Sequence, residues 1–406
     1  MKNKNLTLKN SIPNNNLKKN LSAKYLTKIK KIEVEILKLF KKPNNIYYLL
    51  NQNFKFNFNL RELEKFKNYK NIAIIGMGGS ILGSMAIHNF LKIKIKKKLF
   101  FFDNINQDQI FNFKKNIRND QTLFLVISKS GNTIETIVNF LALTKKIKKK
   151  QKNLILISER KNNILFEIAT KFNLFYVEHK DYVGGRYSIF SEVGILPSYL
   201  MGLNIKKLQK NSKRFLFTKE KLFLRASCLK IANLIKQKKL KSLIFLNYSP
   251  ELEDFLYWCQ QLIAESLGKK NYGLLPMISN VPKDHHSLLQ LYLDGPKDKL
   301  FYVFSTDINL GVNINAGEIS KKLNYLRNKD LFEVKKAQKK ALIETLKKNK
   351  MPFREFKINK IDEEVLSELF SYFILETSII GKLIDIDPFN QPAVEQVKKN
   401  TMKFLK

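Results

Sequence analysis

Short apolar runs followed by helical stretches recur along the chain from residue 71 onward. "NIAIIGMGGSILGSMAIHNFL" (71–91) contains an apolar run, a glycine turn and a helical stretch, and "TLFLVISKSGNTIETIVNFLALTKKI" (122–147) repeats this plan. "NLILISER" (153–160) and "LFYVEH" (174–179) predict further strands. Strands separated by helices of this length indicate a parallel sheet with right-handed crossovers and helices on its faces.

A second copy of this plan begins near Lys221. "KSLIFLNYS" (241–249) and "LFYVFST" (300–306) predict strands, and "ELEDFLYWCQQLIAESLG" (251–268) has apolar residues at helical spacing. The end of the chain predicts a helix, a loop containing Pro388 and a terminal helix. We therefore expect two α/β domains.

The length of 406 residues suits two domains of ordinary size with terminal extensions. The polar, Asn-rich start followed by "KYLTKIKKIEVEILKLF" predicts a tail and a helix without a functional motif. The predicted boundaries are 1–50 for the tail and helix, 51–215 and 216–375 for the two α/β domains, and 376–406 for a C-terminal loop and helix.

The net charge is +39, which raises the question of a nucleic-acid partner. Lysines are spread through the whole chain, and the runs 92–98 and 145–152 fall at predicted helix ends, where cations suit the helix dipole. Asn, Ile and Phe are abundant as well, which favours a general compositional bias over a nucleic-acid surface. An excess of cations also favours anionic metabolites as ligands.

Neither a membrane span nor a secretory signal is predicted. No run approaches the roughly 18 apolar residues of a membrane helix, and "MKNKNLTLKNSIPNNNLKKN" lacks the apolar core of a signal peptide. Cys228 and Cys259 lie in apolar helical stretches, which indicates reduced, packed thiols. We expect a cytoplasmic protein with no metal site.

"SKSGNT" (128–133) places hydroxyls, a lysine and a glycine between a strand and a helix. Such a turn directs several unpaired helix N-terminal amides at one point, which suits a phosphate group. The alternative is an ordinary Ser/Thr helix N-cap with Glu135 in the first turn. The spacing of a Walker P-loop is absent.

"GMGGSILG" (76–83) resembles part of a dinucleotide-binding fingerprint. The fingerprint also requires an acidic residue at a set position after the second strand. "FFFDN" offers only Asp103, which is not in the right place. A backbone that must approach a small ligand closely explains the glycines equally well.

Together the two turns resemble a sugar-isomerase (SIS) domain, and six ordered motifs resemble those of the glucose-6-phosphate isomerase family. The motifs are "GMGGS" (76–80), "SKSGNTIET" (128–136), "VGGRYSIFSEVG" (183–194), "QQLIAESLGK" (260–269), "DHHSLLQL" (284–291) and "NQPAVEQVKK" (390–399). The resemblance implies two SIS domains and a C-terminal helix that returns to the active site. It also implies interconversion of glucose 6-phosphate and fructose 6-phosphate by a homodimer that uses neither cofactor nor metal.

By motif position, the resemblance assigns Glu265 as the base that forms the enediolate and Arg186 as the cation beside the reacting oxygens. His286 and Lys398 match the ring-opening groups, and Glu135 matches the carboxylate that orients the histidine. In the family this histidine reaches across the dimer interface. The residues that match substrate-binding positions are Gly79, Ser80, Ser128, Lys129, Ser130, Thr133, Gln261 and Gln391.

The motifs depart from the family pattern at a few positions. Asn132 stands where a hydroxyl-bearing or bulkier residue is common. Val397 stands where a glycine is common. His285 stands where glutamine is common and is therefore a rival to His286, although the following "SLLQL" favours His286 by register.

These residue types suit an aldose–ketose isomerisation. A partly desolvated carboxylate is a better base, and a fixed guanidinium stabilises negative charge that develops on two oxygens. Two alternatives remain: a dual phosphoglucose/phosphomannose isomerase, and a non-catalytic sugar-phosphate regulator. The regulator would keep the phosphate turn but would not need Glu265, Arg186 and Lys398 together.

Overall fold

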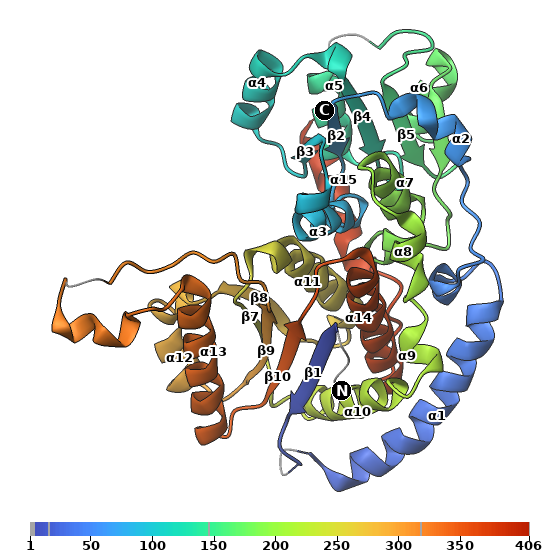
Figure 1. Cartoon of the computed structure of the whole chain (residues 1–406). Helices are drawn as coiled ribbons and strands as arrows, with labels where there is room; N and C mark the ends of the chain where they lie inside the picture. Colours follow the sequence, from blue (N-terminus) through green and yellow to red (C-terminus); the bar gives the residue numbers. More distant parts are fainter. Residues whose placement is uncertain (1–4, 15–16, 145–146, 317–318, 406) are drawn as a thin grey trace.

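The computed structural model of the chain describes residues 5–14, 17–144, 147–316 and 319–405 (Figure 1). It contains two five-stranded sheets, of order β3-β2-β4-β5-β6 and β1-β10-β9-β7-β8, and helices pack against both (Figure 1). The predicted α/β fold with two sheet domains is confirmed. Among the described helices, none combines the length and the apolar character of a membrane span.

The first sheet is parallel throughout. Its strands are β2 (Asn71–Ile75), β3 (Lys98–Phe102), β4 (Thr122–Ile127), β5 (Leu154–Ser158) and β6 (Phe175–Glu178). Strands β2, β4 and β5 are almost wholly buried, which is why they read as continuous apolar runs. The longer helices of this part are α3 (Leu82–Leu91), α4 (Gln107–Asn116), α5 (Ile134–Leu143), α6 (Ile164–Phe172) and α7 (Glu192–Leu200), and the short turns η4 (Gly78–Ser80) and η7 (Gly185–Phe190) lie among them.

The second sheet is mixed, which corrects the prediction of a wholly parallel sheet. Its parallel strands are β7 (Ser242–Asn247), β8 (Leu275–Asn280), β9 (Lys299–Thr306) and β10 (Phe353–Ile358). Strand β1 (Leu6–Ser11), from the predicted tail, pairs antiparallel with β10. Leu6 and Leu8 point into the core and are fully buried, so the tail contributes to the sheet despite its polar composition.

Long helices surround the second sheet and connect it to the first part of the chain. They are α1 (Lys19–Lys41), α10 (Lys221–Lys236), α11 (Glu253–Leu267), α13 (Leu331–Lys348) and α14 (Glu363–Leu383), and the chain ends in α15 (Glu395–Phe404). The predicted boundary at residue 376 falls inside α14, because this helix continues its buried apolar pattern to Leu383.

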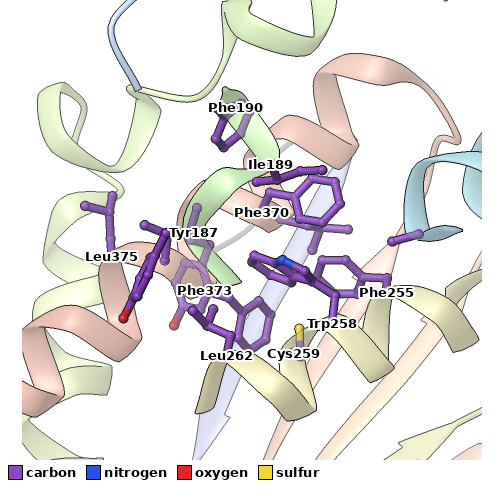
Figure 2. Packing of buried hydrophobic residues seen from close by; sticks show 14 of the residues in the cluster. Tyr187, Ile189, Phe190, Phe255, Trp258, Cys259, Leu262, Phe370, Phe373 and Leu375 are labelled. Atoms are coloured by element: carbon purple, nitrogen blue, oxygen red, sulfur yellow. The ribbon is translucent and has the colours of Figure 1, made fainter. Parts of the chain in front are cut away.

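An aromatic core joins α11, α14 and the turn η7 (Figure 2). The ring centroids of Trp258 and Phe370 are 4.7 Å apart, and those of Phe255 and Phe370 are 5.4 Å apart. From η7, the ring centroid of Phe190 lies 6.3 Å from that of Phe370, and both rings are labelled in Figure 2. This packing fixes η7 relative to α11, and both segments carry residues of the site described below. Cys228 and Cys259 are buried free thiols, as predicted.

A buried ion pair connects α14 to the second sheet. Nη1 of Arg354 on β10 donates to Oε1 and Oε2 of Glu376 at 2.8 and 3.0 Å, and Nη1 also lies 2.9 Å from the hydroxyl of Tyr302. Both charged side chains are almost completely buried. Removal of one partner would leave an uncompensated charge in the core.

We therefore predict that Glu376→Gln lowers the free energy of unfolding by about 3–5 kcal/mol, the usual cost of breaking a buried pair. Urea denaturation would measure this loss. Asp120→Asn, which removes the exposed Arg118–Asp120 pair, is the control and should leave stability nearly unchanged. Equal stability of Glu376→Gln and the wild type would contradict the assignment.

Candidate active site

A cavity of about 350 Å³ opens at the carboxyl ends of β2 and β4 and is closed on another side by α11. The chain leaves β2 for β3 on one side and then crosses to β4 on the other, so these two strands flank the topological switch point, where ligands bind in such sheets. The lining residues are Met77, Gly79, Ser80, Lys129, Ser130, Thr133, Glu159, Gly185, Arg186, Gln261, Glu265 and Gln391.

The turn after β4 gathers hydroxyl groups at one end of this cavity. The hydroxyl oxygen of Thr133 lies 2.9 Å from that of Ser128 and 3.4 Å from that of Ser130. Thr133 is the N-cap residue of α5, but its side chain makes no capping hydrogen bond. The simple N-cap interpretation therefore does not describe this turn. Ser128 is buried directly beneath the cavity and does not line it.

Gly131 makes the tight turn possible. Its φ of +65° is in the left-handed region, and a Cβ atom there would lie 1.8 Å from Oδ1 of Asn163. The amide of Gly131 donates to the carbonyl of Ser128 at 3.0 Å. These contacts hold the hydroxyls and the first amides of α5 on the cavity side.

Two charged residues flank the hydroxyl turn. Nζ of Lys129 donates to the carbonyl of Asp181 at 2.6 Å and lies 3.5 Å from Oε1 of Glu159. Oε2 of Glu159 also accepts a salt bridge from Lys161 at 3.0 Å. The sequence analysis did not identify Glu159, although its position directly after an apolar strand, at the carboxyl end of the sheet, is the signal that could have found it.

The glycine turn after β2 packs against another segment of backbone. A Cβ atom on Gly79 would lie 2.1 Å from the carbonyl carbon of Gly185. The hydroxyl of Ser188 donates to the carbonyl of Gly79 at 3.2 Å. The glycine is therefore needed for contact between η4 and η7, and this contact places Arg186 at the cavity.

Arg186 is the most connected residue of the site, although its side chain is only 1% exposed. Nη1 donates to Oε2 of Glu265 at 3.1 Å and to Oε1 of Gln391 at 2.7 Å. Nη2 donates to the carbonyls of Pro388 and Asn390 at 2.7 and 3.0 Å. Hydrogen bonds to both nitrogens hold the guanidinium plane in one orientation.

The carboxylate of Glu265 is held on both oxygens. While Oε2 accepts from Arg186, Oε1 accepts from Nε2 of Gln261, one helical turn earlier on α11, at 2.8 Å. The side chain of Glu265 is 30% exposed and faces the cavity. Oε1 of Gln261 is buried without a hydrogen-bond partner among the described residues.

A chain of hydrogen bonds supports Arg186 from behind. Nε of Arg186 donates to the hydroxyl of Ser266 at 2.8 Å, this hydroxyl lies 2.8 Å from that of Tyr187, and Tyr187 donates to the carbonyl of Pro388 at 3.1 Å. Because guanidinium groups only donate and carbonyls only accept, Ser266 donates to Tyr187. Burial raises the pKa of Tyr187 to about 12, so the phenol keeps its proton.

Two residues predicted to be catalytic, Glu135 and His286, do not line this cavity. Both are exposed, on α5 and on the turn after β8. The side chain of Lys398 lies outside the part of the structure that is described. His285, the rival histidine, accepts or donates a hydrogen bond at 3.1 Å between Nε2 and the hydroxyl of Tyr248, and burial lowers its pKa.

Comparison with known proteins identifies the family. The model of the phosphoglucose isomerase family matches residues 61–273. The chain belongs to this family. The resemblance predicted from six motifs is thereby confirmed.

Relatives in the family align along most of the chain. The glucose-6-phosphate isomerase of Methanocaldococcus jannaschii is 31% identical, over 86% of this chain and 87% of that protein. That of Mycoplasmopsis synoviae is 33% identical, over 82% of each chain.

Solved structures show the same fold. A hypothetical protein from Thermus thermophilus has a TM-score of 0.84 at 24% identity and covers 98% of this chain and 99% of its own. A glucose-6-phosphate isomerase from Chlamydia trachomatis has a TM-score of 0.69 at 17% identity, over 84% of this chain and 71% of that one.

The packing of η4 on η7 generates a prediction for this phosphoglucose isomerase family member. Gly79→Ala should lower the isomerase kcat about a hundredfold, because its Cβ atom would push the Gly185–Arg186 backbone away and displace the guanidinium. Steady-state kinetics would measure this loss.

Gly184→Ala is the matched control in the same segment. A Cβ atom there meets Tyr187 only at an ordinary 3.6 Å, so this variant should keep most of its activity. Equal activity of the two variants would show that close packing at Gly79 does not position the site.

Proposed function

We propose that this protein, an aldose–ketose isomerase, interconverts glucose 6-phosphate and fructose 6-phosphate through ring opening and an enediolate intermediate. One observation carries the proposal: the carboxylate of Glu265 lies 3.1 Å from the buried guanidinium of Arg186, in a cavity that is also lined by the hydroxyls of Ser130 and Thr133 and by Lys129. A base and a fixed cation beside it are what the transfer of a proton between C1 and C2 requires.

The phosphate occupies the hydroxyl turn. Ser130 and Thr133 offer hydroxyls there, Lys129 offers a cation, and Ser80 with Gly79 closes the opposite wall. Ser128 acts from beneath through its contact with Thr133. The phosphate does not react, and its binding energy holds C1 and C2 against the base.

Glu265 removes the proton from C2 of glucose 6-phosphate and returns it to C1. Its hydrogen bonds to Gln261 and Arg186 fix the orientation of the carboxylate before substrate arrives. Gln261 and Gln391 both line the cavity, and their side-chain amides bind hydroxyls of the sugar.

Arg186 stabilises the negative charge that develops on O1 and O2. Because the guanidinium is already held by Ser266 and by the carbonyls of Pro388 and Asn390, little reorganisation is needed as the charge forms. Preorganised donors of this kind are usually the largest single contribution to catalysis. We assign the charge stabilisation to this residue and not to a metal ion.

Ring opening is assigned to His286 of a second copy of the chain, with Lys398 as a further group and Glu135 as the carboxylate that orients the histidine. One observation supports a homodimer with a shared site: His286 is exposed and lies outside the cavity of its own chain. His285 is hydrogen-bonded to Tyr248, which favours His286 as the ring-opening histidine. We propose a cytoplasmic homodimer without a nucleic-acid or membrane partner.

A coupled assay of the purified protein with fructose 6-phosphate and glucose 6-phosphate tests the proposed function. We expect turnover in both directions, and equal rates with and without EDTA. Mannose 6-phosphate in the same assay tests the dual-specificity alternative. A sugar-phosphate ligand that binds but is never converted would identify a regulator instead.

Glu265→Gln should abolish the exchange of substrate hydrogen with deuterated water. Fructose 6-phosphate should still bind with similar affinity, since the hydroxyl turn after β4 is unchanged. Mass spectrometry of the recovered sugar phosphate would measure exchange, and calorimetry would measure binding. Near-wild-type exchange would remove Glu265 from the mechanism.

The shared site can be tested by complementation. Glu265→Gln and His286→Ala chains, each inactive, are mixed, unfolded and refolded together. If each site takes these residues from different chains, a mixed dimer has one site with both residues intact and one site with neither. Because random pairing makes about half of the dimers mixed, activity should recover to roughly a quarter of the wild-type value.

Absence of any recovery would show that both residues serve the same site in one chain, provided that mixed dimers are shown to form. The isomerase assignment would be unaffected. Each variant refolded alone is the control and should remain inactive.

A further inference from the structure

The loop that carries Gln391 into the cavity is held both by apolar packing and by hydrogen bonds to its backbone carbonyls. Ile386 is buried, and the ring of Phe389 packs against those of Tyr47 and Tyr187. It connects α14 to the short turn η11 (Pro392–Val394) and contains no helix or strand of its own between Asp385 and Gln391. Hydrogen bonds from side chains elsewhere in the chain to its carbonyls therefore add to this packing.

Two cationic side chains meet this loop from opposite sides. Arg186 approaches from the substrate cavity and donates to the carbonyls of Pro388 and Asn390. Lys269 follows the C-terminus of α11, and its Nζ donates to the carbonyls of Asp387 and Asn390, at 2.6 Å each. The carbonyl of Asn390 thus accepts from both cations, and its two lone pairs allow this.

A second cavity, of about 780 Å³, lies beyond the loop. One wall is the segment 268–272 and the other is formed by loop residues and η11, and Glu265 and Gln391 border both cavities. The loop therefore separates the substrate cavity from this second cavity, into which it has room to move. Lys269 lines this second cavity and does not line the substrate cavity.

We propose that Lys269 is a positioning residue, which holds the Asp387–Asn390 loop so that Gln391 stays against Arg186 and the substrate. Without its ammonium group the loop has room to move into the adjoining cavity. Gln391 would then lose its 2.7 Å hydrogen bond to Arg186, and the guanidinium would lose part of its support. This inference rests on the proposed isomerase function.

The matched control is the next residue. Nζ of Lys270 donates to the carbonyl of Asp385 at 3.2 Å, at the other end of the same connection, and its side chain is exposed. Lys270→Met removes an equivalent charge and an equivalent type of hydrogen bond without touching the Gln391 end of the loop.

We expect Lys269→Met to lower kcat about tenfold, the effect of losing hydrogen bonds to a charged group. KM should change less than about threefold, because the phosphate-binding turn is untouched. Lys269→Arg, which keeps the charge, should recover most of the activity, and Lys270→Met should behave as the wild type. In a Gln391→Ala background, Lys269→Met should have little further effect, because both changes act through one contact.

Hydrogen exchange of a peptide that spans residues 385–391 gives an independent readout, and Lys269→Met should exchange faster there than Lys270→Met. Equal kcat losses in the wild-type and Gln391→Ala backgrounds, equal behaviour of Lys269→Met and Lys270→Met, or unchanged exchange would each overturn the proposal. If the wild-type chain proved inactive as an isomerase, the proposed function would fail, and the exchange comparison would still decide the role of Lys269.

Discussion

The site depends on one buried guanidinium. A charged group this far from solvent is tolerated only where its donors are satisfied, and Arg186 has acceptors from α11, from the loop after α14 and from Gln391. The aromatic core holds η7 against α11, and the acceptors of these segments meet at the guanidinium. This arrangement places the carboxylate of Glu265, the amide of Gln391 and the end of the second domain at one edge of the cavity.

Much of the fold was predictable because the central strands are buried on both faces and read as uninterrupted apolar runs. The two turns that border the cavity followed from the same runs, because each turn comes directly after one of them. Strand β1 was not found, because only Leu6 and Leu8 mark it and its pairing partner is β10, near the other end of the chain. Local pattern carries little information about a short edge strand of this kind.

The part of the site that could be predicted from the residues alone is the hydroxyl turn after β4, because all of its groups lie within six consecutive residues (128–133). The assignment of Arg186 came from the family motifs. An arginine after two glycines is common in surface loops, and the neighbours that mark Arg186, namely Glu265 and Pro388, are distant in the sequence. Glu159 was missed although it directly follows the apolar strand β5, because no glycine or hydroxyl turn draws attention to that strand end. His286, predicted from its motif, lies outside the cavity of its own chain.

The kcat of Arg186→Lys tests this account most directly. Lysine keeps the positive charge but has a single nitrogen, so it cannot bind Glu265, Gln391, Ser266 and the loop carbonyls together. We expect kcat to fall about a hundredfold or more, as when a preorganised donor is lost, with smaller change in KM. Wild-type kcat in Arg186→Lys would show that charge alone suffices and that the hydrogen-bond geometry of Arg186 does not organise the site.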